Sequence, residues 1–324
     1  MIFLYGMRNI NAGPANVNRS LVEKSGGKII GIKFKSKFLR LIEGIIKIIW
    51  TDTLIISPIM SMSVFMTKFA KRIGKKVVFL KHGDARYESE INHFKNMEHT
   101  IECEYFIMKH CDLILCVSEW YMNWNKNSYP EFADKFFFVN NGVNLAFREK
   151  KPKRIRSIAV SGGNRDIKNN YEVYQAIEYL NAHMKQKYTL YVFGREYKNS
   201  FSFLSESDVI YLGQLEKTEY YNMLDQIELF IVNSKVESFG LVVADALNTN
   251  CSLLLSRNVG AASILKLRET DYIEDSYDIK EIANKIVWTI EHPNAERIQN
   301  SVEINKVSEE YAVQKIIEVC EGQF

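Results

Sequence analysis

The chain has 324 residues, of which 47% are hydrophobic and 12% aromatic, which is enough to fill two domain cores and excludes a disordered or fibrous protein. The formal net charge is only +3, so the total charge supports neither nucleic acid nor a membrane as a partner. The five cysteines form neither a CxxC pair nor a metal-binding spacing, and their odd number indicates core thiols in a reducing compartment.

The positive charge is concentrated in the first part of the chain. Residues 1–76 hold 14 lysines and arginines against 3 acids, whereas residues 151–324 hold 20 bases against 25 acids. Such an asymmetry predicts a basic surface that meets an anionic partner, and we expect peripheral binding to an anionic membrane. A core helix with a solvated basic face is an equally good interpretation. The bases in and beside the apolar segment "FLRLIEGIIKIIW" are Lys28, Lys33, Lys35, Lys37, Arg40 and Lys47.

Short apolar runs alternate with helical patterns throughout the first half, and each run ends at Gly, Ser, Pro or Asn, as strands that lead into loops do. The chain begins with such a run, so no signal peptide is expected and the cytoplasm is the expected location. Glu43, Lys47 and Asp52 interrupt the most apolar stretch, so no transmembrane helix is expected. The expected strands lie in residues 1–6, 28–34, 53–58, 76–83, 113–118 and 135–142.

The second half repeats this alternation, with helical patterns in residues 169–186 and 217–227. Continuous apolar runs are typical of strands that are buried on both faces, which favours parallel sheets covered by helices. Two doubly wound α/β domains are therefore predicted, 1–150 and 151–310, with the boundary in the charged segment 144–157. The expected strands are 156–163, 188–194, 208–213, 227–234 and 251–256.

Polar and glycine-rich segments follow several of these strands, at the edge of the sheet where α/β proteins bind ligands. Neither GxGxxG nor the Walker A motif is present. Gly13 in "NAGPAN", and Gly162 and Gly163 in "VSGGNRDIKNN", would let the backbone approach a phosphate whose charge Arg165 or Lys168 neutralises. Taken singly, each of these signals is more often a plain turn or a solvated lysine.

The segment "KVESFGLVVADAL" places two carboxylates, Glu237 and Asp245, eight positions apart at a strand-to-helix junction. With "VFG" at 192–194 and "YLGQL" at 211–215, the second half resembles the nucleotide-sugar domain of the retaining family 4 glycosyltransferases. These have the GT-B fold, in which two doubly wound Rossmann-like domains face a central cleft. The first half is similar too, through the Gly13 loop, "HGD" (82–84), "CDLILCVSE" (111–119) and "VNNGVN" (139–144), and residues 311–324 resemble the helix that returns to the first domain.

The resemblance implies a role for each acid. Glu237 would hold sugar hydroxyls and Asp245 the ribose, while Lys168, helped by Arg165, would stabilise the leaving diphosphate. A helix beginning near Phe239 would direct its positive end at the phosphates. The implied catalytic residues are His82, Lys168 and Glu237, and the implied donor-binding residues are Gly13, Gly162, Gly163, Arg165, Lys168, Leu215, Glu237, Ser238, Phe239, Gly240, Leu241 and Asp245.

Two positions depart from the family pattern. Asp245 stands where a glutamate is usual, and Gly163 lies where an arginine is usual, with Arg165 slightly displaced. No Asp-x-Asp occurs in the sequence, so a metal-dependent GT-A transferase is not expected, and neither is a metal or other cofactor.

The function predicted from these observations is a cytoplasmic, metal-independent, retaining hexosyltransferase. It would use a nucleotide-diphosphate sugar, with UDP-sugar ahead of GDP-sugar, and a glycan or lipid-linked acceptor in surface polysaccharide or glycoconjugate synthesis. It would work peripherally at the inner face of the membrane and without nucleic acid. Two alternatives remain open: another GT-B enzyme, such as a nucleotide-sugar epimerase or a phosphorylase, and a non-catalytic partner or chaperone of an active glycosyltransferase.

Overall fold

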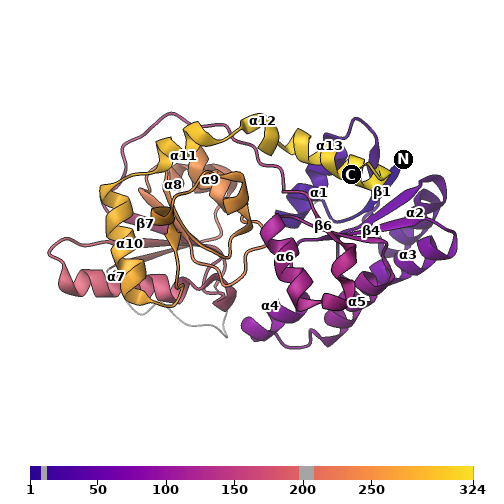
Figure 1. Cartoon of the computed structure of the whole chain (residues 1–324), viewed down its shortest axis with the longest axis horizontal. Helices are drawn as coiled ribbons and strands as arrows, with labels where there is room; N and C mark the ends of the chain where they lie inside the picture. Colours follow the sequence, from indigo (N-terminus) through magenta and orange to yellow (C-terminus); the bar gives the residue numbers. More distant parts are fainter. Residues whose placement is uncertain (9–12, 197–207, 324) are drawn as a thin grey trace. The chain divides into compact units, whose positions relative to one another are not determined.

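The computed structural model describes residues 1–8, 13–196 and 208–323, which form two compact units (Figure 1). Unit 1 comprises residues 1–90, 94–143 and 304–324, and unit 2 comprises residues 91–93 and 144–303. Each unit holds one six-stranded, all-parallel sheet covered by helices, the α/β architecture predicted from the sequence.

The sheet of unit 1 has the order β2-β1-β3-β4-β5-β6. All residues of β1, β3 and β5 are buried, which explains the continuous apolar runs in the sequence. Its strands are β1 (Ile2–Tyr5), β2 (Ile29–Gly31), β3 (Thr53–Ile56), β4 (Lys76–Lys81), β5 (Leu113–Cys116) and β6 (Phe136–Phe138). Its helices are α1 (Gly13–Glu23), α2 (Lys37–Trp50), α3 (Ser61–Arg72), α4 (Ala85–Ile91), α5 (Glu98–His110), α6 (Glu119–Ser128), α12 (Ile304–Val307) and α13 (Glu309–Glu321), with the 3-10 turn η1 (Pro130–Lys135).

The last helix, α13, belongs to unit 1 although it follows the whole of unit 2 in the chain. It packs against α1, as Figure 1 shows. Lys24 of α1's C-terminal flank pairs with Glu309 and Glu310 at 2.8 and 2.6 Å, and the Lys76 ammonium donates to two carbonyls near the end of α13. A cation at the C-terminal end of a helix satisfies carbonyls that have no partner within the helix.

The sheet of unit 2 has the order β12-β11-β10-β7-β8-β9. Helices α7 and α10 pack on one another and close the core over the central strands. The strands are β7 (Ser157–Ser161), β8 (Thr189–Phe193), β9 (Val209–Gly213), β10 (Leu229–Val232), β11 (Ser252–Ser256) and β12 (Tyr272–Ile273). The helices are α7 (Asn170–His183), α8 (Lys217–Leu224), α9 (Val242–Asn248), α10 (Ile279–Glu291) and α11 (Ala295–Ser301), with the 3-10 turns η2 (Asp166–Lys168), η3 (Gly260–Ile264) and η4 (Glu269–Asp271).

The order of strands places a topological switch point in unit 2 between β7 and β10. The chain leaves β7 toward β8 and β9 and then returns across the sheet to β10, which pairs with the other side of β7. Loops that leave the carboxyl ends of two such strands diverge, and the space between them is where open α/β sheets bind ligands.

Two further expectations concern the chain as a whole. All five cysteines are buried and free, which confirms their prediction as core thiols. Within the described ranges, no helix is both long and apolar enough to cross a membrane.

Candidate functional site

Two of the predicted catalytic residues meet at the switch point of unit 2. Lys168 ends η2, in the loop after β7, and Glu237 lies in the loop after β10. The Lys168 ammonium forms an ion pair with Glu237 Oε2, and the Ser234 hydroxyl donates to the same oxygen at 3.4 Å. Their side chains are only 15% and 14% exposed, so this is a largely buried charged pair that keeps some contact with solvent.

The glycine turn before Lys168 needs both of its glycines. Gly162 and Gly163 have φ values of +91° and +64°, a region that residues with a Cβ rarely adopt. A Cβ on Gly162 would lie 2.7 Å from Cγ of Lys168, and one on Gly163 would lie 1.9 Å from the carbonyl oxygen of Arg195. The turn therefore gives the Lys168 stem its room, while Arg165 Nε donates to the Gly162 carbonyl at 3.4 Å.

Three asparagines that the sequence analysis missed hold this turn in place. Asn170 donates through Nδ2 to the carbonyls of Ser161 and Gly163 at 3.0 and 2.7 Å. Asn169 has a left-handed backbone (φ 54°), and both it and Asn233 donate to the carbonyl of Ser276, at 2.6 and 2.9 Å. The usable signal was their position: Asn169 and Asn170 follow the glycine turn, and Asn233 directly follows β10.

The Glu237 loop is fixed by pairing with the segment after β11. The Glu237 amide donates to the Asn258 carbonyl at 2.9 Å, and the Gly260 amide returns a hydrogen bond to the Glu237 carbonyl at 3.0 Å. Phe239 is buried, whereas Ser238 and Leu241 are half-buried at the rim of the same loop. These contacts hold the Glu237 backbone independently of its side chain.

The expectation of a helix beginning near Phe239 is wrong by about one turn, since α9 starts at Val242. Gly240 has φ +95°, which is incompatible with a right-handed helix and delays its start. Glu237, Ser238, Phe239 and Gly240 therefore belong to a loop that ends where the helix begins.

Asp245 lies within α9 and already has a partner from α8. The Tyr221 hydroxyl donates to Asp245 Oδ1 in a short hydrogen bond. Burial raises the pKa of the Asp245 carboxyl, although this hydrogen bond opposes the effect. Leu215, the residue implied for base contact, precedes α8 and is half-buried. The structure thus brings Tyr221 to the predicted ribose acid, a pairing that depends on how α8 packs against α9 and has no local sequence signal.

The remaining predicted residues, His82 and Gly13, lie in unit 1 at the carboxyl edge of its sheet. His82 directly follows β4, and its Nε2 is buried with no hydrogen-bond partner among the residues that the structure describes. Burial lowers the pKa of His82 to about 4, so the imidazole is neutral at pH 7. Gly13 is the exposed first residue of α1, and residues 9–12 of the same predicted loop lie outside the described ranges.

A buried charge cluster flanks His82 on either side in the sequence. Lys81 pairs with Glu104 and, at 3.0 Å, with Asp84, while Asp84 also accepts from the Tyr129 hydroxyl at 2.8 Å. Although burial opposes it, Glu104 and Asp84 raise the pKa of the Lys81 ammonium. The sequence analysis missed this cluster. It connects the His82 loop to α5 through Glu104 and to the residue before η1, Tyr129.

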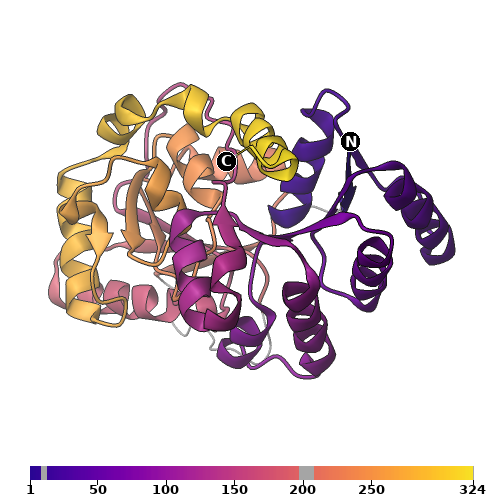
Figure 2. The same cartoon turned by 45° about the vertical axis from the view of Figure 1, so that its right-hand side comes forward.

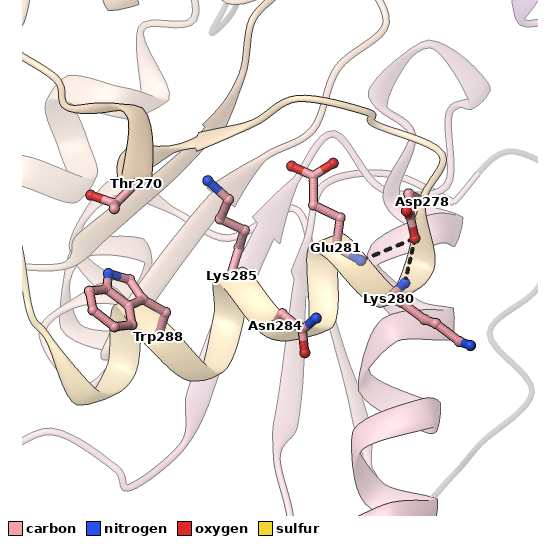
Figure 3. Close-up of a pocket in the computed structure, with 7 residues that line it drawn as sticks. All are labelled: Thr270, Asp278, Lys280, Glu281, Asn284, Lys285 and Trp288. Atoms are coloured by element: carbon pink, nitrogen blue, oxygen red, sulfur yellow. Dashed lines mark hydrogen bonds between the residues drawn. The ribbon is translucent and has the colours of Figure 1, made fainter.

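A surface pocket of about 550 Å³ lies along α10 (Figure 3). Its N-terminal end is closed by Asp278, which accepts from the amides of Lys280 and Glu281 at 2.9 and 3.1 Å. None of the predicted donor residues lines it. In the described part of the chain, no three His, Cys, Asp or Glu side chains gather as a metal site. The lining residues of the pocket are Thr270, Asp278, Lys280, Glu281, Asn284, Lys285 and Trp288.

Comparison with known protein families gives a match in unit 2. The family described as Glycosyl transferases group 1 matches residues 145–304, nearly all of this unit. Unit 2 is therefore similar to the domain that defines this family. No curated protein matches the sequence at a significant level.

Solved structures match the chain over both units. Anabaena Alr3699/HepE in complex with UDP-glucose is 12% identical, with a TM-score of 0.72 and 99% of each chain covered. Sucrose-phosphate synthase from Thermosynechococcus elongatus is 14% identical, with a TM-score of 0.71, covering 99% of this chain and 98% of its own. The apo form of the lipopolysaccharide outer core galactosyltransferase WaaB is 12% identical, with a TM-score of 0.67, covering 100% of this chain and 99% of its own. The two parallel sheets and these neighbours show that the chain has the GT-B fold.

Proposed function

We propose that this protein is a retaining, metal-independent family 4 hexosyltransferase that takes its sugar from a nucleotide-diphosphate donor. The observation that carries the proposal is the Lys168–Glu237 pair, which joins the carboxyl ends of adjacent strands at the switch point of the unit that matches the group 1 glycosyltransferase family. A donor sugar needs a cation for its diphosphate and an acceptor for its hydroxyls, and this pair supplies one of each.

Donor binding would exchange the partners of this pair. The diphosphate would take the place of Glu237 beside Lys168, and the released carboxylate would accept hydrogen bonds from the sugar hydroxyls. The loops on either side are held by backbone hydrogen bonds and by the asparagines, so the exchange would need only side-chain movement. The backbone of such a site is pre-organised, while its charged side chains can change partners when a ligand binds.

The transfer step would form a bond between the acceptor oxygen and C1 of the sugar as the bond from C1 to the diphosphate oxygen breaks on the same face. The acceptor's hydroxyl proton would pass to the departing phosphate, so no covalent sugar–protein intermediate is required. Lys168, with Arg165 nearby, would stabilise the charge that develops on the diphosphate. His82, neutral and with an unpartnered Nε2, could then accept from or donate to a sugar hydroxyl.

We propose UDP-sugar as the donor and a glycan or lipid-linked acceptor in surface polysaccharide or glycoconjugate synthesis. Two neighbours support this choice in outline: one is described in complex with UDP-glucose, and another is a lipopolysaccharide outer core galactosyltransferase. A lipid-linked acceptor would be reached from the cytoplasm by peripheral attachment to the inner face of the membrane.

A screen of nucleotides and nucleotide sugars by thermal shift tests the proposal first. A ligand at 100 times its dissociation constant adds about 2.7 kcal/mol to the free energy of unfolding, which gives a readable shift. We expect UDP and one or more UDP-hexoses to stabilise the protein, and donor turnover to persist in EDTA. Binding without turnover for any acceptor would favour the non-catalytic partner, and strict dependence on Mn²⁺ or Mg²⁺ would contradict metal independence.

A further inference from the structure

Helix α2 of unit 1 exposes its apolar side chains, the reverse of an ordinary surface helix. Phe38 is 68% and Trp50 78% exposed, and the helix lies at the rim of the unit, beside α3 (Figures 1 and 2). The exposed side chains recur at helical spacing, so they form one stripe from the first turn to the last. The large apolar residues that are exposed in this stripe and in the loop before it, which we call the α2 face, are Phe34, Phe38, Leu39, Ile42, Ile46, Ile49 and Trp50.

Two charged residues of the same helix, Glu43 and Lys47, face inward and anchor it. Glu43 is only 8% exposed and accepts from the amides of Lys33 and Phe34 at 2.9 and 3.0 Å. The Lys47 ammonium donates to Glu43 Oε1 and to the Gly31 carbonyl, each at 2.5 Å. Although burial opposes it, Lys47 and the two amides lower the pKa of Glu43, so the carboxylate stays charged. Rotating the helix to bury the α2 face would expose Glu43 and Lys47 and break their hydrogen bonds. These bonds therefore fix the α2 face toward solvent.

The charge around the α2 face is predominantly positive. Residues 24–51 contain seven lysines and arginines and a single acid, Glu43, which is buried. Lys33, Lys35 and Lys37 are all exposed at the N-terminal end of the stripe. Asp52, just after the helix, is exposed, but the N-terminal ammonium of Met1 pairs with it at 2.7 Å. A fixed apolar stripe with bases at its N-terminal edge matches an anionic lipid surface, where the apolar side chains enter the headgroup region and the lysines meet phosphate.

We propose that the α2 face is a membrane-insertion surface, with the helix lying in the plane of an anionic bilayer. This deepens the proposed membrane attachment by naming the element that makes it and by requiring apolar insertion in addition to charge. The proposed function enters this proposal at one point: membrane binding would hold the enzyme beside a lipid-linked acceptor. Its physical test needs no sugar donor, so the two proposals can fail separately.

The test is co-sedimentation of the full-length protein with vesicles of phosphatidylcholine alone and with phosphatidylglycerol added. We expect strong binding only to the anionic vesicles. The double variant Phe38→Ser with Ile42→Ser should bind at least tenfold more weakly, because both side chains are exposed and would lose apolar burial in the membrane without affecting the core. The double variant Lys35→Ala with Lys37→Ala should also lose about tenfold, and this loss should shrink in high salt.

A tryptophan pair supplies the matched control. Trp50 lies on the α2 face, whereas Trp288 of α10, also well exposed, belongs to unit 2. Trp50→Ser should weaken vesicle binding and remove the blue shift of emission on binding, and Trp288→Ser should do neither. Equal binding by wild type and the apolar variants would overturn the proposal. A second outcome would also overturn it: the wild type binds no vesicles and is a dimer, and the Phe38 and Ile42 changes make it monomeric. A second copy of the chain would then cover the α2 face.

Discussion

Both units place charged side chains where a parallel strand ends, but the two groups are built differently. In unit 1, Lys81 at the end of β4 is fully buried and pairs with both Asp84 and Glu104. In unit 2, Lys168 pairs with one carboxylate among the described residues, that of Glu237, and both side chains are partly exposed. A buried cluster with every charge matched holds a loop in one conformation, whereas a partly exposed pair can exchange one partner for a ligand. The comparison therefore separates a structural charge group from a binding one.

The largest effect should come from breaking the buried cluster. Lys81→Met leaves the carboxylates of Asp84 and Glu104 buried without their cation, and such changes cost about 3–5 kcal/mol of stability. We expect a matching fall in the denaturant midpoint of unfolding. Lys168→Met, the control in unit 2, should cost less than Lys81→Met, because the Glu237 carboxylate that it leaves keeps some solvent contact and still accepts from the Ser234 hydroxyl. Similar losses for the two variants would remove the distinction between the groups.

His82, whose Nε2 has no partner among the described residues, extends the comparison through pH. Burial lowers its pKa to about 4, from 6.5 in the unfolded chain, so the unfolded chain binds a proton that the folded protein does not. Stability should therefore be lost as pH falls from about 6.5 to 4, by roughly 2–3 kcal/mol. The measurement is the free energy of unfolding against pH for wild type and His82→Asn. The other five histidines are exposed, so the variant should show a shallower slope in this window, and an unchanged slope would show that His82 is not the group responsible.

The exchangeable pair should affect turnover more than stability. Glu237→Gln keeps the shape of the side chain but removes a charge that holds sugar hydroxyls as the sugar becomes positively charged in the transition state. A charged hydrogen bond contributes about 1.5–3 kcal/mol, so turnover at saturating donor should fall by about 10- to 100-fold. Steady-state kinetics with the donor found by thermal shift measures this effect. Full activity in the variant would show that Glu237 has only a structural role.

The smallest effect should appear at Asp245. One of its oxygens already accepts from Tyr221, so the ribose would use the remaining capacity, and Asp245→Asn should weaken donor binding by about tenfold with little change in turnover. Tyr221→Phe is the matched control: it frees the acid without removing it, so donor affinity should be kept. A larger loss for Tyr221→Phe than for Asp245→Asn would make the tyrosine the ribose contact.

Most strands could be predicted because burial on two faces leaves a continuous apolar run that a single sequence displays, as in β1, β3, β5 and β10. The exception is β12, whose two residues are too few to form a run. The Lys168–Glu237 meeting could be expected from resemblance, but its cause, the adjacency of β7 and β10, comes from the order of strands. Asp245 and Lys81 have partners on other helices, Tyr221 and Glu104. These pairings depend on how the helices pack, which a local sequence pattern does not reveal.

Helix α2 shows the same limit. Its sequence does not say which side of the helix points inward, and a core helix with a solvated basic face was an equally good interpretation. That interpretation is wrong, because hydrogen bonds from the loop before the helix hold Glu43 inside. Orientation was decided by backbone amides outside the helix, which hydrophobic periodicity does not include.

Calorimetric titration of the nucleoside diphosphate that stabilises the wild-type protein tests the central claim most directly. If the diphosphate replaces Glu237 beside Lys168, then Lys168→Met should weaken binding by about 10- to 100-fold, the value of one charged hydrogen bond. Glu237→Gln should bind at least as tightly as wild type, because the ligand no longer has to displace a charged partner. Equal affinity of Lys168→Met and wild type, or a loss in Glu237→Gln as large as that in Lys168→Met, would contradict the exchange and the donor site built on it.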